Sequence, residues 1–193
     1  MSYLIVGLLL FLGVHSVAIV APAWRDRWIA QYGERKWKGI YSLLSIVGFL
    51  LLVYGSGQAR QEPVMLYAPP AWTRHAAALA MLPVFPLLLA AYLPGRIKAA
   101  LKHPMLVAVK LWAVAHLLAN GMLADVLLFG GFLAWAVFDR LSLKRRPPKA
   151  IPGAPPSPAN DAIAVVAGLG IYVAFVFWLH LKVIGVPVIV PGT

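Results

Sequence analysis

A stretch in the second half of the chain, HPMLVAVKLWAVAHLLAN, carries several side chains that could do chemistry. Ionisable groups in hydrocarbon cost roughly 2.5–3.5 kcal/mol each, so they need partners, water or a function. At 100° per residue, Trp112, His116 and Asn120 fall within one narrow arc of a helix. His103 and Lys110 lie on the opposite side. The stretch therefore predicts a membrane helix between neighbours, with a polar lining on at least one side.

Two histidines lie deep in apolar sequence, His15 in LGVHSV and His116 in the stretch above. Neutral imidazole is a common ligand of haem iron and zinc, and histidines on different helices are how bundles hold haem. Their expected depths in the membrane differ by about 10 Å at 1.5 Å per residue, a gap that helix tilt would have to close. The alternative is that each imidazole hydrogen-bonds to a neighbouring helix.

The remaining polar candidates have two interpretations each. His75, His116 and His180 all lie towards the outer side and form a possible second cluster, although His75 and His180 are near span ends, where an imidazole can reach water. His103 precedes a proline, which favours a helix start. Lys110 either extends towards the cytoplasm or provides a counter-charge for a propionate, phosphate or carboxylate.

Composition identifies an integral membrane protein. Of 193 residues, 62% are hydrophobic and only 12% are charged, against about 45–50% and 25% in soluble domains. The chain has no cysteine, which excludes disulfides, thiolate ligands and covalent haem attachment. Nucleic acid is not an expected partner, because the basic residues behind the net charge of +11 cluster at span ends. No Ser/His/Asp arrangement, phosphate loop or paired carboxylate is present.

We expect an all-α, polytopic transmembrane helix bundle with five to six spans in a single domain, residues 1–193. Most apolar segments approach the roughly 20 residues that cross a bilayer. Prolines at 83, 86 and 94 predict a kinked third span. A Pro-rich cytoplasmic linker is expected at about 145–160, before the last span. The apolar segments are 2–22, 39–56, 72–93, 104–121, 123–139 and 161–184.

Basic residues predict the orientation. Thirteen of the seventeen Lys and Arg residues lie in the first, third and fifth loops, so the positive-inside rule makes those loops cytoplasmic and both termini periplasmic. The first apolar run has no basic residue before it, so we expect a retained span rather than a signal peptide. Asp139 and Arg140 are expected to form an interfacial ion pair, and Trp112 and Trp135 could line a cofactor pocket. The aromatic belt is predicted to include Trp24, Trp28, Trp37 and Trp72.

Several blocks resemble the bacterial NnrU family of membrane proteins over about residues 3–146. They are LGVHSVAIVAPAWR, WKGIYSLLSIVGFLLLVYG, PPAWTRH, AAYLPGRIKAALKHPMLVAVKLWAVAHLLANG and FLAWAVFDRLSLKRR, the fourth being the most specific. NnrU proteins are associated with denitrification, through production of active nitrite and nitric oxide reductases. The resemblance implies a protein of the bacterial inner membrane that works with components of those reductases.

The plant ζ-carotene isomerases are similar to this family; they bind haem b through histidines and isomerise a cis double bond. Carried over by residue, the histidine of the G-x-H-S motif is His15, and the H-x12-H pattern falls on His103 and His116. The resemblance implies His15 and His116 as axial ligands of non-covalent haem b. A ligand switch to thiolate is unavailable in a chain without cysteine, which argues against the isomerase chemistry but not against haem.

The block that begins at His103 also resembles the membrane methyltransferases that modify prenylcysteine. Their tyrosine and glycine positions are Leu106 and Ala108 here, and their acidic pair is replaced by Arg140 and a basic run. A shared membrane fold is therefore expected, but not methyl transfer. Three functions remain open: a haem protein supporting nitrogen-oxide respiration, a haem-dependent polyene isomerase, and a cofactor-free scaffold or transporter. In the first, Trp112 and Asn120 would line the pocket and Lys110 or cytoplasmic arginines would meet propionates.

Overall fold

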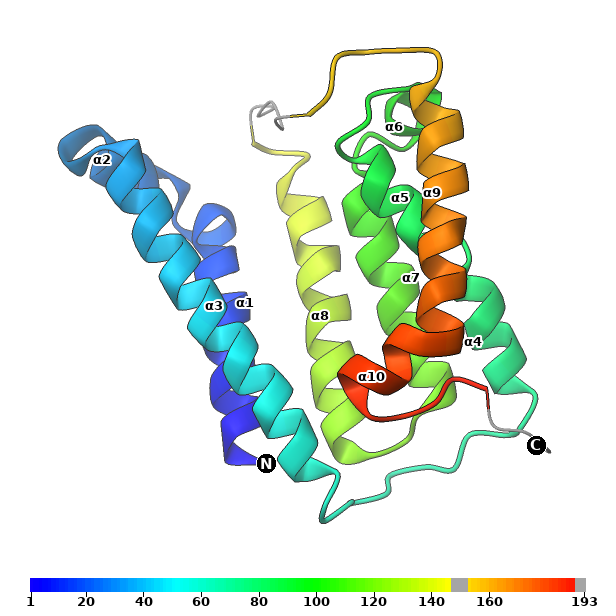
Figure 1. Cartoon of the computed structure of the whole chain (residues 1–193). Coiled ribbons are helices and arrows are strands. Elements are labelled where there is room, and N and C mark those ends of the chain that lie inside the picture. The colour runs from blue at the N-terminus through cyan, green and yellow to red at the C-terminus, as the bar shows by residue number, and fades with distance from the viewer. Residues whose placement is uncertain (147–152, 190–193) are drawn as a thin grey trace. The chain divides into compact units, whose positions relative to one another are not determined.

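The computed structural model describes residues 1–146 and 153–189. All the regular secondary structure in these residues is helical (Figure 1). The described residues contain no strand, only an isolated antiparallel bridge between Met65 and Met122. The predicted all-α class is confirmed. Backbone polar groups in lipid must be satisfied within the segment, and a helix does this.

The chain divides into two compact units. The first consists of residues 1–68 and 120–146, and the second of residues 69–119 and the described residues from 153 onward. Each unit therefore combines segments that are far apart in the sequence. Whether the chain acts as a single domain, as expected from its sequence, stays a prediction.

Four helices form the first unit. Helix α1 packs along α3, and both contact α8. Their small apolar core is made by Leu4, Leu52, Ala59 and Ala124. A short helix, α2, connects α1 to α3 and has no buried residue. The helices are α1 (Ser2–Val20), α2 (Pro22–Tyr32), α3 (Glu34–Ala59) and α8 (Leu123–Ser142).

Helices α1 and α3 cross so closely that glycine is required between them. A Cβ on Gly48 would lie 2.8 Å from the backbone nitrogen of Phe11, and a Cβ on Gly55 would overlap the backbone of Leu4. Apolar attraction adds little between helices in lipid, so association depends on close packing, which small residues allow. The glycines therefore set the register of α1 on α3.

The second unit is built around α5, which packs against both α7 and α9. A Cβ on Gly168 of α9 would overlap the backbone of Pro86, so this crossing is also close. Figure 1 shows α9, in orange, beside α5. The helices are α4 (Thr73–Met81), α5 (Val84–Ala90), α6 (Arg96–Leu101), α7 (Pro104–Ala119), α9 (Asn160–Ala174), the π-helix η1 (Phe175–Leu179) and α10 (His180–Ile184).

Proline determines two helix boundaries in this unit. The predicted third span is divided into α4 and α5 at Leu82 and Pro83, as its prolines indicated. Helix α7 begins at Pro104, and the main-chain carbonyl of His103 accepts bonds from the N–H groups of Leu106 and Val107. The His-Pro pair thus starts a helix, since proline at the first position loses no bonded N–H.

Within the part of the chain that the structure describes, four regions are long and apolar enough to cross a membrane: α1, α3, the α4–α5 pair and the continuous run from α9 to α10. Helix α7 is apolar but has 16 residues, and α8 carries charged residues near both ends. Large apolar side chains face outward, as at Leu9 (70% exposed), Leu43 (63%) and Val166 (72%). Apolar surface this extensive requires lipid. The chain is a membrane protein, and five or six spans stay a prediction.

The predicted linker is partly held in place. Residues 147–152 lie outside the described residues, and residues 153–157 have no regular structure. Asn160, at the start of α9, donates from Nδ2 to the carbonyls of Pro94 (2.8 Å) and Pro155 (3.0 Å). Asp161 accepts from the main-chain N–H groups of Arg96 and Ile97. The end of this segment is therefore tied to the turn before α6 rather than acting only as a spacer.

The crossing of α1 and α3 predicts an asymmetry between two glycines of one helix. Gly55→Val should destabilise the protein by about 1–3 kcal/mol, because overpacking a close contact forces backbone shifts. Gly57→Val adds the same side chain where nothing lies within 4 Å, so it should change the stability little. Thermal unfolding of both variants in detergent measures the difference, and equal melting temperatures would contradict the close crossing.

Candidate functional site

The His15 imidazole has a defined tautomer. Its Nδ1 lies 2.7 Å from the main-chain carbonyl oxygen of Phe11, one turn earlier in α1. A carbonyl oxygen only accepts, so Nδ1 carries the hydrogen and donates. The neutral ring then has its lone pair on Nε2, which is the arrangement of a metal-ligating histidine whose other nitrogen is held by a carbonyl.

Aromatic rings from three helices of the first unit surround His15. Phe11 stacks on it with ring centroids 4.3 Å apart and an interplanar angle of 27°. Tyr41 of α3 lies 5.1 Å away and Trp135 of α8 6.0 Å away, the latter edge-on at 88°. The Nε1 of Trp135 is buried and has no hydrogen-bond partner among the described residues. An apolar cradle with one unused donor therefore lies beside the imidazole.

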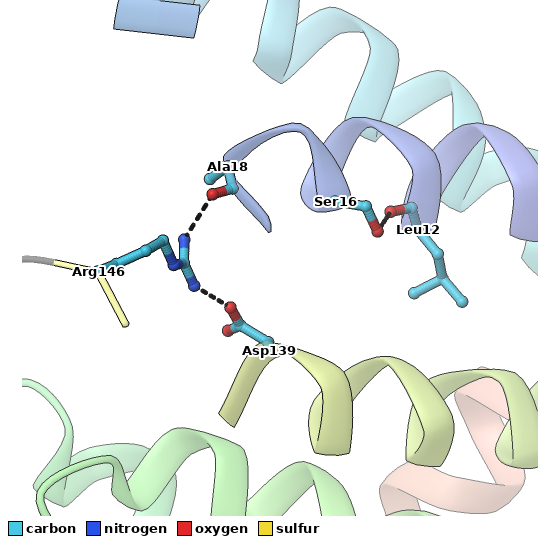
Figure 2. A network of polar contacts seen from close by, with 5 residues as sticks. All are labelled: Leu12, Ser16, Ala18, Asp139 and Arg146. Atoms are coloured by element: carbon cyan, nitrogen blue, oxygen red, sulfur yellow. Dashed lines mark hydrogen bonds and ion pairs between the residues drawn. The ribbon is translucent and has the colours of Figure 1, made fainter. Parts of the chain in front are cut away.

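A polar network lies one turn further along α1 and α8 (Figure 2). Arg146 forms an ion pair with Asp139 and donates to the main-chain carbonyl of Ala18 at 3.0 Å. Both side chains are mostly buried, at 21% and 17% exposure. The predicted pair of Asp139 with Arg140 is therefore wrong. Consecutive side chains of a helix point about 100° apart. Arg146 lies beyond the end of α8, and its guanidinium reaches both Asp139 and the last turn of α1.

His116 of the second unit repeats the arrangement of His15. Its Nδ1 lies 2.8 Å from the carbonyl oxygen of Trp112, and the two rings are 5.3 Å apart. The Nε2 atom again carries the lone pair. Helix α7 ends at Ala119, so Asn120 does not continue the predicted arc. It belongs to the first unit, where its carbonyl accepts from the Tyr67 hydroxyl at 2.7 Å.

The other predicted residues are distributed as follows. Lys110 is half-buried on α7, and His103 lies half-buried just before that helix. His75 is exposed on α4. The proposed contacts of Lys110 and His103 with a cofactor stay predictions. His15 and His116 belong to different units, and both their role as ligands and their pairing stay predictions.

His180 is a further candidate ligand, because it directly follows the π-helix. It follows η1, where the helix widens over Phe175–Leu179, and π-helical segments occur frequently at functional sites. Its Nδ1 lies 2.6 Å from the carbonyl of Val186, and it lies within electrostatic range of His116. All three members of the suggested outer cluster, His75, His116 and His180, lie in the second unit. No sequence pattern indicated the π-helix.

The described part of the chain contains no group of three or more His, Cys, Asp or Glu side chains that could hold a metal ion. Haem ligation requires only one or two imidazoles, because the macrocycle supplies the other four donors. The donor set of this protein therefore fits haem. The imidazoles of His15 and His116, each with Nδ1 bound to a carbonyl of its own helix, could take axial positions.

A helical chain with outward apolar side chains and histidines inside its apolar helices is a helical membrane protein. The chain belongs to the NnrU family, whose family model, described as NnrU protein, matches residues 3–188. The match covers essentially the whole chain. No curated protein and no solved structure matches it.

The network at Arg146 predicts a stability difference between two aspartates. Asp139→Asn should destabilise the protein by about 1.5–3 kcal/mol, because it removes a charged hydrogen-bond partner from a mostly buried guanidinium. Asp26→Asn breaks an exposed pair with Arg25, where Asp26 is 68% exposed, and should change the stability by less than about 1 kcal/mol. Chemical unfolding of the two variants in detergent compares them, and similar losses would contradict a structural role for Arg146.

Proposed function

We propose that this NnrU-family protein binds haem b non-covalently in the bacterial inner membrane, with His15 and His116 as axial ligands. The observation that carries the proposal is the tautomer shared by both histidines. Each Nδ1–H is held by the carbonyl four residues earlier, so each Nε2 presents a lone pair from a ring of fixed orientation. Haem bound to such nitrogens would supply one-electron redox chemistry.

The surroundings of His15 support this assignment. Phe11, Tyr41 and Trp135 surround the half-buried imidazole with aromatic rings, and the apolar shell around a metal site influences its redox potential. The buried Nε1 of Trp135 could donate to an acceptor that enters the cradle. Lys110, Trp112 and Asn120, together with His103 at the start of α7, are proposed to complete the cofactor surroundings, with Lys110 or cytoplasmic arginines opposite carboxylates.

We propose that the physiological role is support of denitrification, by electron transfer, by maturation of reductases or by handling nitric oxide. This link comes from the NnrU family, whose members are associated with the production of active nitrite and nitric oxide reductases. Components of those reductases are the proposed partners. The proposed topology, with both termini periplasmic and the basic loops cytoplasmic, rests on the positive-inside rule.

A second ligand set is favoured by one observation. His180 lies in the same unit as His116 and within electrostatic range of it. Its Nδ1 also donates to a carbonyl, so its ring has the same tautomer as that of His116. A haem held by His116 and His180 would require no residue of the first unit. The variants below separate the two sets.

The haem proposal predicts a spectrum. Detergent-purified protein, expressed with added haemin, should show a b-type α-band in the reduced-minus-oxidised difference spectrum. His15→Ala and His116→Ala should each lose or shift that band, because each removes one axial nitrogen. His75→Ala is the control: its imidazole is exposed on α4, and the band should stay unchanged.

The outcomes discriminate between ligand sets. A band that survives His15→Ala but is lost in His116→Ala and His180→Ala would replace the first set with the second. A colourless wild-type protein would contradict haem binding and leave a cofactor-free scaffold or transporter. Size-exclusion profiles that match the wild type show that a variant has lost a ligand rather than its fold.

The respiratory role predicts a growth phenotype. In a denitrifying strain that carries only this copy, the double variant His15→Ala/His116→Ala should reduce nitrite far more slowly, because the proposed redox centre is lost. Normal oxygen-dependent growth is the control. Normal nitrite reduction by the variant strain would contradict the link between haem and denitrification, even if the purified protein binds haem.

A further inference from the structure

Helix α2 is too short to cross a membrane and too exposed to belong to a core. Its 11 residues extend about 16 Å at 1.5 Å per residue, roughly half of the hydrocarbon thickness. None of its residues is buried. Gly33, with φ 93°, separates it from α3. Figure 1 shows α2 at the end of the α1–α3 pair away from the N-terminus, where two apolar helices end.

An aromatic stripe follows this short helix. Trp24, Trp28 and Tyr32 are spaced by four residues and lie on one side. Trp28 contacts Tyr32 with ring centroids 4.9 Å apart, and Trp37 of α3 lies 5.6 Å from Trp28 and 6.0 Å from Trp24. Trp24 and Tyr32 are still 49% and 47% exposed. Two large amphipathic rings therefore remain available at the edge of a packed aromatic cluster.

Positive charge surrounds the stripe. Arg25 lies over the Trp37 ring at 5.8 Å and also pairs with Asp26. Arg27 in α2 and Arg35, Lys36 and Lys38 in the first five residues of α3 add further positive charge, against the acidic residues Asp26 and Glu34. Arg27, Arg35 and Lys36 are exposed. The surface thus combines aromatic rings, which favour the headgroup level, with an excess of cations, which favours anionic headgroups.

We propose that α2 is an interfacial helix that binds the anionic lipid surface of the membrane, with Trp24 and Tyr32 inserted among the headgroups and the flanking basic residues on lipid phosphates. A lipid surface fits better than a protein partner, because α1 and α3 on either side are apolar helices that bring α2 to the boundary of hydrocarbon and water. The charge excess predicts a preference for anionic over zwitterionic lipid. The proposal does not depend on haem.

The chain has no cysteine, so single spin labels can report the depth of α2 in full-length protein. Gln31→Cys places a label beside the stripe, about 60° from Trp28, and Ala30→Cys places one about 160° away. Both residues are exposed in the wild type. Labelled protein is reconstituted in nanodiscs of phosphatidylcholine alone or with phosphatidylglycerol. Collision with oxygen, enriched in lipid, and with an aqueous nickel complex is measured by power saturation.

In discs with anionic lipid, the Gln31 label should collide at least threefold less with nickel than the Ala30 label. This protection should fall in pure phosphatidylcholine and in the double variant Arg27→Gln/Lys36→Gln. The matched control, Lys144→Gln/Arg145→Gln, removes the same charge from exposed residues after α8 and should leave the label protected. Arg27→Lys/Lys36→Arg substitutes the same two positions but keeps both charges, and it should retain protection. This result would show that the lost charge, and not a folding defect, causes the loss of protection in the Gln variant.

Three results would overturn the proposal. Equal nickel collision at the two labels would place α2 in water. Equal protection of the Gln31 label in the two lipid compositions would mean that anionic headgroups are not recognised. An equal loss of protection in the control double variant would attribute the effect to total charge instead of to the basic residues around the stripe.

Discussion

The close crossing of α1 and α3 is the constraint on which the first unit depends. Gly48 and Gly55 let the two backbones meet, and this register brings Tyr41, two turns before Gly48 on α3, to 5.1 Å from the His15 ring. A slip of one turn would move the rings about 5.4 Å relative to each other. The helices have little apolar attraction to correct such a slip in lipid. Small residues at the crossing therefore determine what surrounds the imidazole.

A second constraint is that polar side chains in apolar helices need partners within reach. His15, Ser16, Ser45 and His116 all bond to the carbonyl four residues earlier in their own helix. Such a bond satisfies the hydrogen-bonding group of a side chain within its own helix, so that no polar group of a neighbouring helix is needed. A hydroxyl can be satisfied in this way, whereas an imidazole has a second nitrogen. In both histidines the helix that carries the residue binds Nδ1 but not Nε2.

The apolar segments could be predicted because lipid requires long runs of apolar residues and proline interrupts helices for local steric reasons. This explains the agreement for α1, α3 and the break at Pro83. The partner of Asp139 could not be predicted, because it depends on how the chain folds back after α8. Helix α2 was missed because its arginines and tryptophans resemble a loop at a membrane boundary. The π-helix before His180 has no sequence signal, since one extra residue in a turn depends on packing.

Whether His15 is a ligand or a satisfied structural residue depends on its Nε2 atom, because the bond from Nδ1 is common to both interpretations. A structural histidine in an apolar site should use both nitrogens, and the obvious donor beside it is Trp135, edge-on at 6.0 Å. Yet the Nε1 of Trp135 has no partner among the described residues, so it does not donate to the imidazole. A buried unpaired donor costs about 1–3 kcal/mol. The Nε1–H of Trp135 therefore stays an unused buried donor beside the His15 ring, and a cofactor as its acceptor stays a prediction.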